Sequence, residues 1–585
     1  MIEPRVYRAA FLPAILALVV AAFSLTDRPT ALSADVSADI LFDGGAAADE
    51  AGIVVNRFPD RSPGSAGDQS SAEYVSQELS ALGFDAVSDR FAAGDRQLVN
   101  VTGTRTGATR ERLVVMAPRD SFSSPDLTGS AADTATLLQL ARALEGRATN
   151  KTIVLVSYDG SALGQAGVRR FLESAEDPTR IEQVLALSDV GAGPPAVPGI
   201  VDWSENLRMA GLGLTRTAEA ALRQELPDAE RPSGALDQLV HLVLPIGPGA
   251  QGVLLANGYN AVRISGSGQS QPPPGQQEIA KNRLGSLGRA VLTTLSALDE
   301  GAPLVQGPET YISIGTKLLP GWAVSVLAVA LIIPALVASI DAAARARRRR
   351  EPVVVWLLWI ARPCLAFLAG LILALLLGLV GIAPDVGAAS PPPGANPFDF
   401  GAAVVFLLVA SVAAGTWLAL RPLAELDELG RPDPTIPGAG VAASLVFSVV
   451  ALLVWLPVVG LGNPYAALVV VVPLHLWMLA TLGDAPMHLR TRALLYVLGL
   501  VPVALVGAYY LLRLHLDPAA GAWYLFQLVT GGQVQIRAAL LICLFLGVAV
   551  AVLAIIITQG RGRRANPDEP LVRGPATDLF ISSRG

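Results

Sequence analysis

The fold is decided by residues 112–157, RLVVMAPRDSFSSPDLTGSAADTATLLQLARALEGRATNKTIVLVS. The two ends of this stretch, Arg112–Met116 and Thr152–Ser157, are short runs rich in β-branched residues, as expected for buried parallel strands. Between them, Ala135–Leu144 has the apolar spacing of a helix. A strand, a helix and a strand in this order predict a three-layer α/β domain, whose functional site lies beyond the carboxyl ends of the strands.

The same domain extends in both directions from this stretch. Ser70–Leu82 has apolar residues at helical spacing and stops at Gly83, a residue that commonly ends helices. Residues 27–316 have the charges, turns and mixed periodicity of an ordinary soluble domain, and they are numerous enough to bury a full core. We therefore expect one folded domain over 27–316.

The rest of the chain has the composition of a membrane protein. The whole sequence is 52% hydrophobic and 16% charged, too apolar for a soluble protein of 585 residues. A net charge of −6 without a basic face argues against a nucleic-acid partner. Both cysteines, Cys364 and Cys543, lie in apolar runs, so the domain contains no disulfide. Three lysines against forty arginines indicate a GC-rich bacterial genome.

Eight apolar runs are long enough to cross a bilayer, which needs about 20 helical residues. The first run follows two arginines and is similar to a signal peptide, but only a weak cleavage site, ALSA-D at 31–35, follows it, so we expect a retained anchor over 1–26. The other seven fill 317–558, and 559–585 reads as a disordered tail. The runs are Ala9–Leu25, Leu318–Ile340, Val353–Ile382, Gly401–Leu420, Val441–Leu461, Tyr465–Leu482, Ala493–Leu512 and Ala538–Ile557.

The distribution of arginine predicts the orientation of these spans. The run Arg345–Arg350 places the loop after the second span in the cytoplasm, and most other loop arginines fall on the same side. Both termini are then cytoplasmic and 27–316 lies outside. Arg513 and Arg537 break the pattern, and we expect them to snorkel at the interface. Arg362-Pro363 interrupts the third run, whose first turns we place along the membrane surface.

Segments of the domain resemble the zinc-dependent aminopeptidases and their non-enzymatic transferrin-receptor-like and nicastrin-like relatives. In chain order these segments are SPGSAGDQSSAEYVSQELSALGF (62–84), NVTG (100–103), VVMAPRDS (114–121), PDLTGSAADTATLLQLAR (125–142), YDGSALGQAGVRRF (158–171), LALSDVG (185–191) and NGYNAVRISG (257–266). The resemblance implies a three-layer, phosphorylase/hydrolase-like α/β fold. It also implies a site with two zinc ions, held by two imidazoles and three carboxylates beside a glutamate base.

This chain lacks most of the residues that the resemblance requires. The first histidine position holds Pro118 and the bridging-aspartate position holds Gly129. Ser161 and Ala162 stand where the glutamate base and a glutamate ligand belong. The late histidine should follow 257–266, but SGQSQPPPGQQ contains none. The resemblance therefore implies a degenerate member of the family without bound zinc.

Asp189 matches a metal ligand, and Asp120 matches the carboxylate that supports the first histidine. An alternative alignment puts Asp133 at the bridging position, where Asp133 and Asp189 together could hold Ca²⁺ or Mg²⁺ weakly. Asp189 is either a relic bonded to nearby backbone or a functional group. We expect Asp159 to be a turn residue, and His241, in the strand-like segment LVHLVLPIG, to be a hydrogen-bonded core histidine rather than a replacement ligand.

Outside the domain, His475 and Arg362 are polar residues within apolar runs. Ionisable residues in such positions commonly indicate a functional site. We interpret them as satisfied contacts between helices; a transport pathway with an exported sensor domain is a third hypothesis. The overall plan is similar to the peptidase-like subunit of the glycosylphosphatidylinositol transamidase, and more loosely to membrane-anchored exopeptidases, by architecture alone.

The leading hypothesis is a catalytically inactive scaffold in the bacterial plasma membrane, without a cofactor. It would bind a peptide, an amine or an exported protein, and its helices would contact lipid and partner subunits. The alternative is an active zinc aminopeptidase with displaced ligands.

Overall fold

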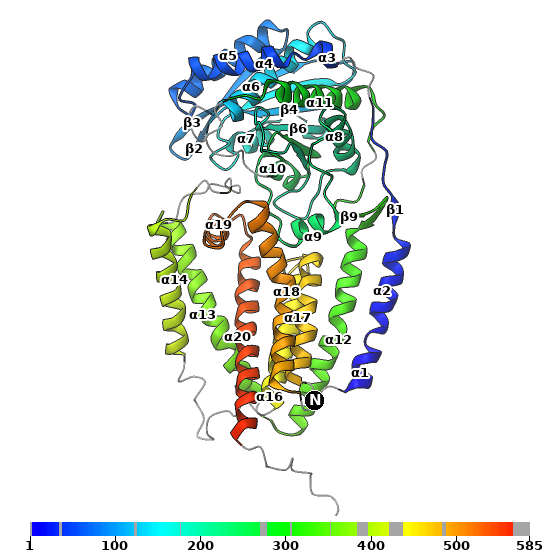
Figure 1. Ribbon diagram of the computed structural model, residues 1–585, viewed down its shortest axis with the longest axis vertical. Helices are drawn as coiled ribbons and strands as arrows, with labels where there is room; N and C mark the ends of the chain where they lie inside the picture. The colour runs from blue at the N-terminus through cyan, green and yellow to red at the C-terminus, as the bar shows by residue number, and fades with distance from the viewer. Residues whose placement is uncertain are drawn as a thin grey trace, which may run out of the picture.

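The computed structural model describes residues 3–33, 38–121, 126–175, 177–269, 278–304, 307–351, 353–382, 393, 396–420, 437–482 and 487–565. Figure 1 shows a rounded α/β domain standing on one end of a helical bundle, with the N-terminus at the opposite end. A small sheet lies between the two parts. The structure therefore combines an α/β fold over part of the chain with many apolar helices, as expected.

The domain combines a mixed sheet with helices on both faces. Its strands are β2 (Asp85–Ala93), β3 (Arg96–Arg105), β4 (Arg112–Pro118), β5 (Thr152–Tyr158), β6 (Ile181–Ser188), β7 (Gly199–Val201) and β8 (Ala261–Ser265). Its helices are α3 (Ala38–Leu41), α4 (Gly44–Arg57), α5 (Ala66–Ala81), η1 (Leu127–Ala131), α6 (Ala132–Leu144), α7 (Ala166–Ser174), η2 (Pro178–Arg180), α8 (Leu212–Glu225), α9 (Ala235–Val243), α10 (Ala250–Ala256) and α11 (Lys281–Glu300).

The seven strands run in the order β2-β3-β5-β4-β6-β8-β7. Strands β5, β4, β6 and β8 are mutually parallel, and Val114 of β4 lies opposite Val154 and Val184 of its two neighbours. Strands β2, β3 and β7 are antiparallel additions at the two edges. The strand–helix–strand prediction over 112–157 is confirmed, and four parallel carboxyl ends meet at one edge of the sheet.

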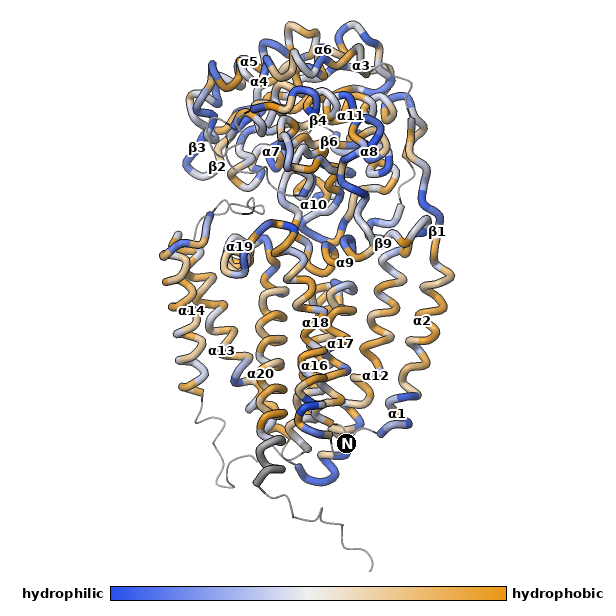
Figure 2. Tube along the Cα trace, viewed as in Figure 1, coloured by the Kyte–Doolittle hydropathy of each residue, from blue (hydrophilic) through white to orange (hydrophobic). Residues whose placement is uncertain are grey.

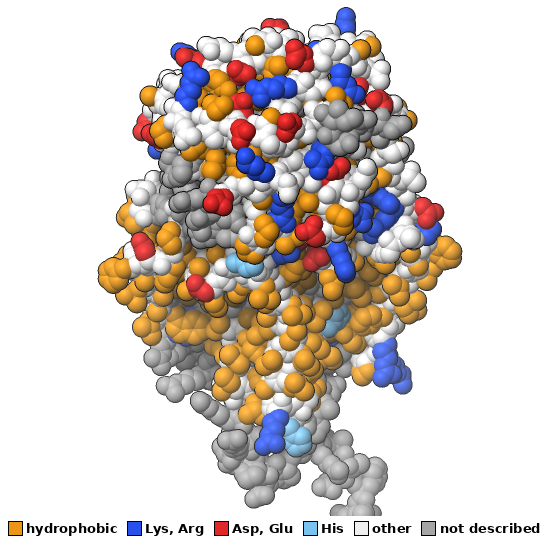
Figure 3. All heavy atoms as spheres, turned by 45° about the horizontal axis from the view of Figure 1, so that its top comes forward, with side chains coloured by type: hydrophobic (Ala, Val, Ile, Leu, Met, Phe, Trp, Pro, Cys, Tyr) orange, Lys and Arg blue, Asp and Glu red, His pale blue; other side chains and the backbone are white. Residues whose placement is uncertain are grey.

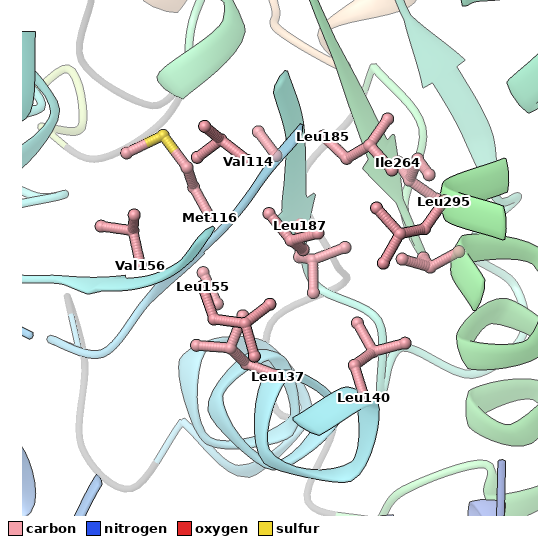
Figure 4. Close-up of a cluster of buried hydrophobic side chains, with 14 of the residues drawn as sticks. Val114, Met116, Leu137, Leu140, Leu155, Val156, Leu185, Leu187, Ile264 and Leu295 are labelled. Atoms are coloured by element: carbon pink, nitrogen blue, oxygen red, sulfur yellow. The ribbon is translucent and has the colours of Figure 1, made fainter. Parts of the chain in front are cut away.

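Two helical layers cover the sheet. Figure 1 places α4, α5, α6 and α11 over one face, and α7 and α10 over the other. In the core, Leu155 and Leu187 point toward Leu137 of α6, whereas Met116 and Val156 point to the opposite face (Figure 4). These side chains are almost fully excluded from solvent. Successive side chains of a strand point to opposite faces of the sheet, and helices bury both faces. The central strands are therefore apolar on both sides.

The segment around His241 differs from the prediction of a strand. It forms α9, whose first turn is stabilised by Asp237, because its carboxylate accepts the Gly234 N–H at 3.0 Å. The sequence LVHLVL allows either structure, and the capping residues before it decide for a helix. His241 is buried, as expected, with its ring stacked on Trp203 at a centroid distance of 3.8 Å.

A three-stranded antiparallel sheet, order β1-β10-β9, connects the domain to the bundle. Its strands are β1 (Thr26–Asp27), β9 (Tyr311–Ile314) and β10 (Lys317–Pro320). Thr26 pairs with Leu318, so the two chain segments that enter the domain are tied side by side. The predicted boundary at 316/317 and the predicted span start at Leu318 are therefore slightly early, because β10 precedes α12, which starts at Gly321.

Eight helices in the described residues are long and apolar enough to cross a membrane, as predicted. The helices of the bundle are α1 (Pro4–Ala9), α2 (Leu12–Phe23), α12 (Gly321–Arg348), α13 (Val353–Leu379), α14 (Phe400–Ala419), α16 (Pro437–Trp455), α17 (Pro464–Leu482), α18 (Leu489–Arg513), α19 (Pro518–Thr530) and α20 (Ile536–Ala565). Figure 2 shows hydrophobic residues predominating along these helices, below a domain in which hydrophobic and hydrophilic residues alternate. The short α19 lies across the domain-facing end of the bundle.

Two predictions about this block need correction. Helix α13 continues through Arg362-Pro363 instead of breaking there, and Arg362 donates to the Trp417 carbonyl at 2.9 Å with its guanidinium over the indole ring. Helix α20 extends to Ala565, so the first residues of the predicted 559–585 tail are helical. Residues 566–585 lie outside the described residues.

His475 is used to hold the N-terminal anchor. Its Nδ1 lies 2.7 Å from the Tyr7 hydroxyl, and its Nε2 lies 2.9 Å from the Leu331 carbonyl oxygen of α12. Ala14 and Ala17 of α2 pack against Ala330 of α12. These contacts support the interpretation of His475 as an interhelical contact, and they favour an anchor that is part of the bundle.

Arg513 and Arg537, which we expect at the membrane interface, have partners within the protein. Arg513 forms an ion pair with Glu230 of the domain, and Arg537 donates to the Val458 and Gly460 carbonyls at 3.4 Å. Arg345, in contrast, lies 3.7 Å from Glu3 at the far end of the bundle. The arginines that deviate from the charge pattern are therefore paired within the protein.

We predict that the domain lies outside the cytoplasm and that the Arg345–Arg350 end lies inside. A reporter that is active only outside the cytoplasm, fused after residue 300, should be active, and the same reporter after 348 or 575 should be silent. The physical reason is the preference of clustered arginines for the cytoplasmic side. Activity at 348 would contradict the orientation, because it would place Arg345, Arg347 and Arg348 on the translocated side.

Candidate functional site

All the site residues predicted from the sequence come together at the carboxyl-end edge of the sheet. Pro118 ends β4, Ser161 and Ala162 follow β5, and Asp189 follows β6. The turn of η1, with its neighbour α6, brings Gly129 and Asp133 to the same edge, as shown by the hydrogen bonds described below. The position of the site follows from the parallel strands, whose carboxyl ends must meet.

Asp120 holds the turn that contains Ser161 and Ala162. Its carboxylate accepts the Ser161 N–H at 2.9 Å, the Ser161 hydroxyl at 3.0 Å and the Ala162 N–H at 3.1 Å. Burial, followed by the nearby Asp68 charge, raises the pKa of Asp120 to about 6. Because this folded-state pKa is raised above 3.8, the group stabilises the fold most in acid, and that contribution is lost as the pH rises through about 6.

Gly129 has no room for a ligand side chain. A Cβ atom at this position would lie 2.4 Å from the carboxylate of Asp126, which also accepts the Ser130 N–H at 2.9 Å and its hydroxyl at 2.8 Å. Asp126 has a left-handed backbone, with φ of 42°. An aspartate in place of Gly129 would therefore require this turn to rearrange.

Two fully buried arginines supply the positive charge of the site. Arg119 binds the carboxylate of Asp68 through two bonds, at 3.0 and 2.7 Å, and its Nη2 lies 3.9 Å from Asp159. Arg61 donates to the Phe58 carbonyl at 2.9 Å and lies among the charges of Asp126, Asp68 and Asp120. Both arginine side chains are 0% exposed. Buried charges persist only when they are paired and hydrogen-bonded in this way.

Neither arginine was predicted from the sequence to belong to the site. Arg119 stands directly before Asp120, and a charged pair at the end of an apolar strand was the available signal. Asp159, expected to be a turn residue, accepts the Val99 N–H at 3.2 Å and the Gly160 N–H at 2.6 Å. Burial, followed by Asp68, raises the pKa of Asp159 to about 8. Asp159 is thus part of the buried charge network.

Asp133 and Asp189 meet, but their carboxylates have other partners. Asp133 accepts the backbone N–H groups of Asp189 and Val190 at 3.1 and 3.0 Å. Asp189 accepts the hydroxyls of Ser188 at 2.7 Å and Ser267 at 2.9 Å. Burial raises the pKa of both carboxyls, and the Asp189 charge raises that of Asp133 further. The backbone N–H groups expected to bond a relic Asp189 are thus bonded to Asp133 instead, and the Asp189 carboxylate is bonded to hydroxyls.

Zinc, which the sequence resemblance implies, does not fit these residues. The chain has four histidines, of which His241 lies on α9 and the other three on or beside bundle helices. Zinc sites of this class need imidazole or thiolate donors beside carboxylates, with an open position for water. Across the described residues, no three His, Cys, Asp or Glu side chains are grouped so that they could hold a metal ion. Residues 270–277, in the segment where the late histidine was sought, lie outside the described residues.

We predict that Arg119→Met lowers the free energy of unfolding by about 3–5 kcal/mol, because it leaves the buried Asp68 carboxylate without its partner. Thermal and denaturant unfolding of the full chain in detergent, followed by tryptophan fluorescence, measures this loss. Arg110→Met, on an exposed turn, is the matched control and should stay within about 0.5 kcal/mol of the parent. The double variant Arg119→Met/Asp68→Leu should recover part of the loss; equal instability of single and double variants would contradict the pairing.

No family model matches the chain, and no curated protein matches it. Among solved structures, the chain is similar to a zinc aminopeptidase from Bacillus subtilis, with 12% identity, a TM-score of 0.37 and coverage of 43% of this chain and 94% of that one. It is also similar to the Fimbriiglobus ruber glutaminyl cyclase (16%, TM-score 0.36, coverage 44% and 95%) and to LapB from Legionella pneumophila (14%, TM-score 0.39, coverage 49% and 81%). With TM-scores below 0.5 these likenesses carry no weight for its activity, and its fold rests on the strand order and register described above.

Proposed function

We propose that this chain is a catalytically inactive, aminopeptidase-like membrane protein that acts as a binding or scaffold subunit. One observation supports this most directly. The carboxylates at the carboxyl-end edge are bonded to backbone N–H groups, to hydroxyls and to buried arginines, and no imidazole lies among them. A hydrolytic site needs the opposite arrangement, with an open metal position or a base that can reach a water molecule.

The ligand that fits this proposal is a peptide or an exported protein. Ser161, Ala162 and Asp189 remain partly exposed at the edge of the sheet, so a surface is left beside the buried charges. Asp189 could accept a hydrogen bond from an amine or a backbone N–H group through its remaining lone pairs. This chemistry suits recognition of a peptide segment.

The membrane block suits contact with lipid or with partner subunits. Only 11% of the most apolar 18-residue stretch of α14 is buried within the protein, and the same fraction of the corresponding stretch of α18 is buried. Figure 3 shows a broad apolar surface on the bundle, below the charged surface of the domain. We place the protein in a bacterial plasma membrane with both termini in the cytoplasm, in an architecture similar to the peptidase-like transamidase subunit.

The two other hypotheses have less support. An active metallo-aminopeptidase with displaced ligands would need donors that are already used in internal bonds. A transporter would need polar groups free to line a path, whereas His475 and Arg362 are bonded within the bundle.

We predict that the purified full-length protein retains no stoichiometric zinc after dialysis and releases no N-terminal residue from peptides, even with zinc added. Loss of a general base alone typically removes about 10²–10⁴ in rate, and loss of the metal removes the nucleophile as well. Elemental analysis and an aminopeptidase assay measure both properties. One or two zinc ions per chain, with activity abolished by a chelator, would replace this proposal with the active enzyme.

We predict that Ala162→Arg removes a co-purifying peptide or protein from the full-length chain isolated from its native membranes. The new side chain would cover the partly exposed turn without removing a side-chain hydrogen bond. Val87→Arg, 58% exposed at the far edge of the sheet, is the matched control. Identification of bound proteins by mass spectrometry distinguishes the two variants. Identical partners on both would show that this edge is not the binding surface.

A further inference from the structure

The loop after β8 contacts the candidate site at one end and the membrane bundle at the other. Its first residues, 266–269 (Gly-Ser-Gly-Gln), directly follow β8, and we call this segment the linking loop. We infer that this loop couples the Asp189 site to the end of α18, so that a change at either end alters the other. The inference rests on the proposed binding role, and it connects that site to the membrane bundle through the linking loop.

At the site, the linking loop packs directly on Asp189. The Ser267 hydroxyl donates to the Asp189 carboxylate at 2.9 Å, and the Gly266 N–H donates to the Ser188 carbonyl at 2.9 Å. A Cβ atom at Gly266 would lie 2.0 Å from the Asp189 carbonyl oxygen. The loop therefore cannot shift here without moving Asp189.

At the bundle, the last residue of the linking loop binds the last residue of α18. Arg513 Nε donates to the Gln269 side-chain oxygen at 2.8 Å, and Arg513 also pairs with Glu230 of the domain. Tyr509 and Tyr510 of α18 also contact the domain, because their hydroxyls lie 3.3 and 3.2 Å from the ring nitrogens of His241. Gln269 is buried, so these polar bonds have little competition from water.

The middle of the linking loop is too tightly packed to absorb a displacement. Gly268 has a φ of 62°, and a Cβ atom there would lie 2.7 Å from the Glu230 carboxylate and 2.9 Å from the Val197 carbonyl oxygen. The Gly268 carbonyl accepts Arg263 Nη2 at 3.4 Å. Glu230 thus contacts both the loop and Arg513, and only one residue separates the bond to Asp189 from the bond to α18.

A purely mechanical attachment of the domain predicts something different. Asn463 on the loop before α17 already fixes α9, by donating to the Leu242 carbonyl at 2.8 Å. If the Gln269–Arg513 contact only added to that attachment, removing the Ser267 hydroxyl would leave amide exchange in α18 unchanged. Coupling requires the effect to be reciprocal, because two linked equilibria must affect each other equally.

Hydrogen–deuterium exchange on the full-length protein in lipid nanodiscs tests the coupling. Ser267→Ala should increase amide exchange at residues 508–514 by about fivefold, and Arg513→Gln should produce a comparable increase at residues 188–191. Ser161→Ala removes a similar hydroxyl from Asp120 in the other half of the site and should leave α18 unchanged. Gln269→Leu provides a second variant, which should increase exchange at both ends.

Exchange at 508–514 that is unaffected by both Ser267→Ala and Gln269→Leu would overturn the inference. An equal increase caused by Ser161→Ala would overturn it too, since the effect would then be general loosening of the domain. The experiment uses no ligand. Its failure would thus reject the coupling while leaving the binding role intact, and loss of the binding role would be seen instead with Ala162→Arg.

Discussion

The ion pair between Arg119 and Asp68 is the interaction on which the rest of the site depends. Two hydrogen bonds join the side chains, and neither is exposed to solvent. Moving two charges into the interior costs several kcal/mol for each ion, which only close, bidentate bonding offsets. Arg119, which follows β4, also donates to the Val99 carbonyl of β3. Together with its bonds to Asp68 of α5, this contact joins the three elements. With Arg61 beside it, two buried guanidinium groups lie among the carboxylates near the strand ends.

The attachment of the domain to the bundle uses the same kind of buried polar contact. His241 is stacked on Trp203 and bonded to Tyr509 and Tyr510, and burial lowers its pKa to about 3. Its neutral form therefore stabilises the junction fully above the ordinary pKa of 6.5, and this contribution is lost as the pH falls toward 3. Arg513 at the end of α18 completes the contact. These contacts position the domain on the bundle. The proposed scaffold role and the proposed coupling between the Asp189 site and α18 therefore depend on the same junction.

Periodicity and composition were sufficient for the large elements. The strand–helix–strand unit over 112–157, the helix that ends before Gly83 and the eight apolar spans were all predicted, because long periodic patterns reflect burial directly. Short or ambiguous segments were not. LVHLVL reads equally well as a strand or a helix, and β1, β9 and β10 are too short to leave a pattern. The helix through Arg362-Pro363 was also missed, since the Trp417 contact that accommodates Arg362 comes from another helix.

The sequence by itself determined the fold class, the number of helices apolar enough to cross a membrane and the absence of carboxylate and imidazole side chains at Pro118, Gly129, Ser161 and Ala162, because each of these depends on residue type and spacing along the chain. Only the tertiary structure decided which charged groups meet around these positions. Arg119 is far in sequence from Arg61 and Asp68, and it meets them only when β4 is packed against α5 and the turn before α5. The same holds for Gln269 and Arg513, separated by 244 residues. Such contacts produce no periodic pattern in the sequence. The free-energy cost of burying one charged side chain is offset by a partner in another segment, which the local sequence does not contain.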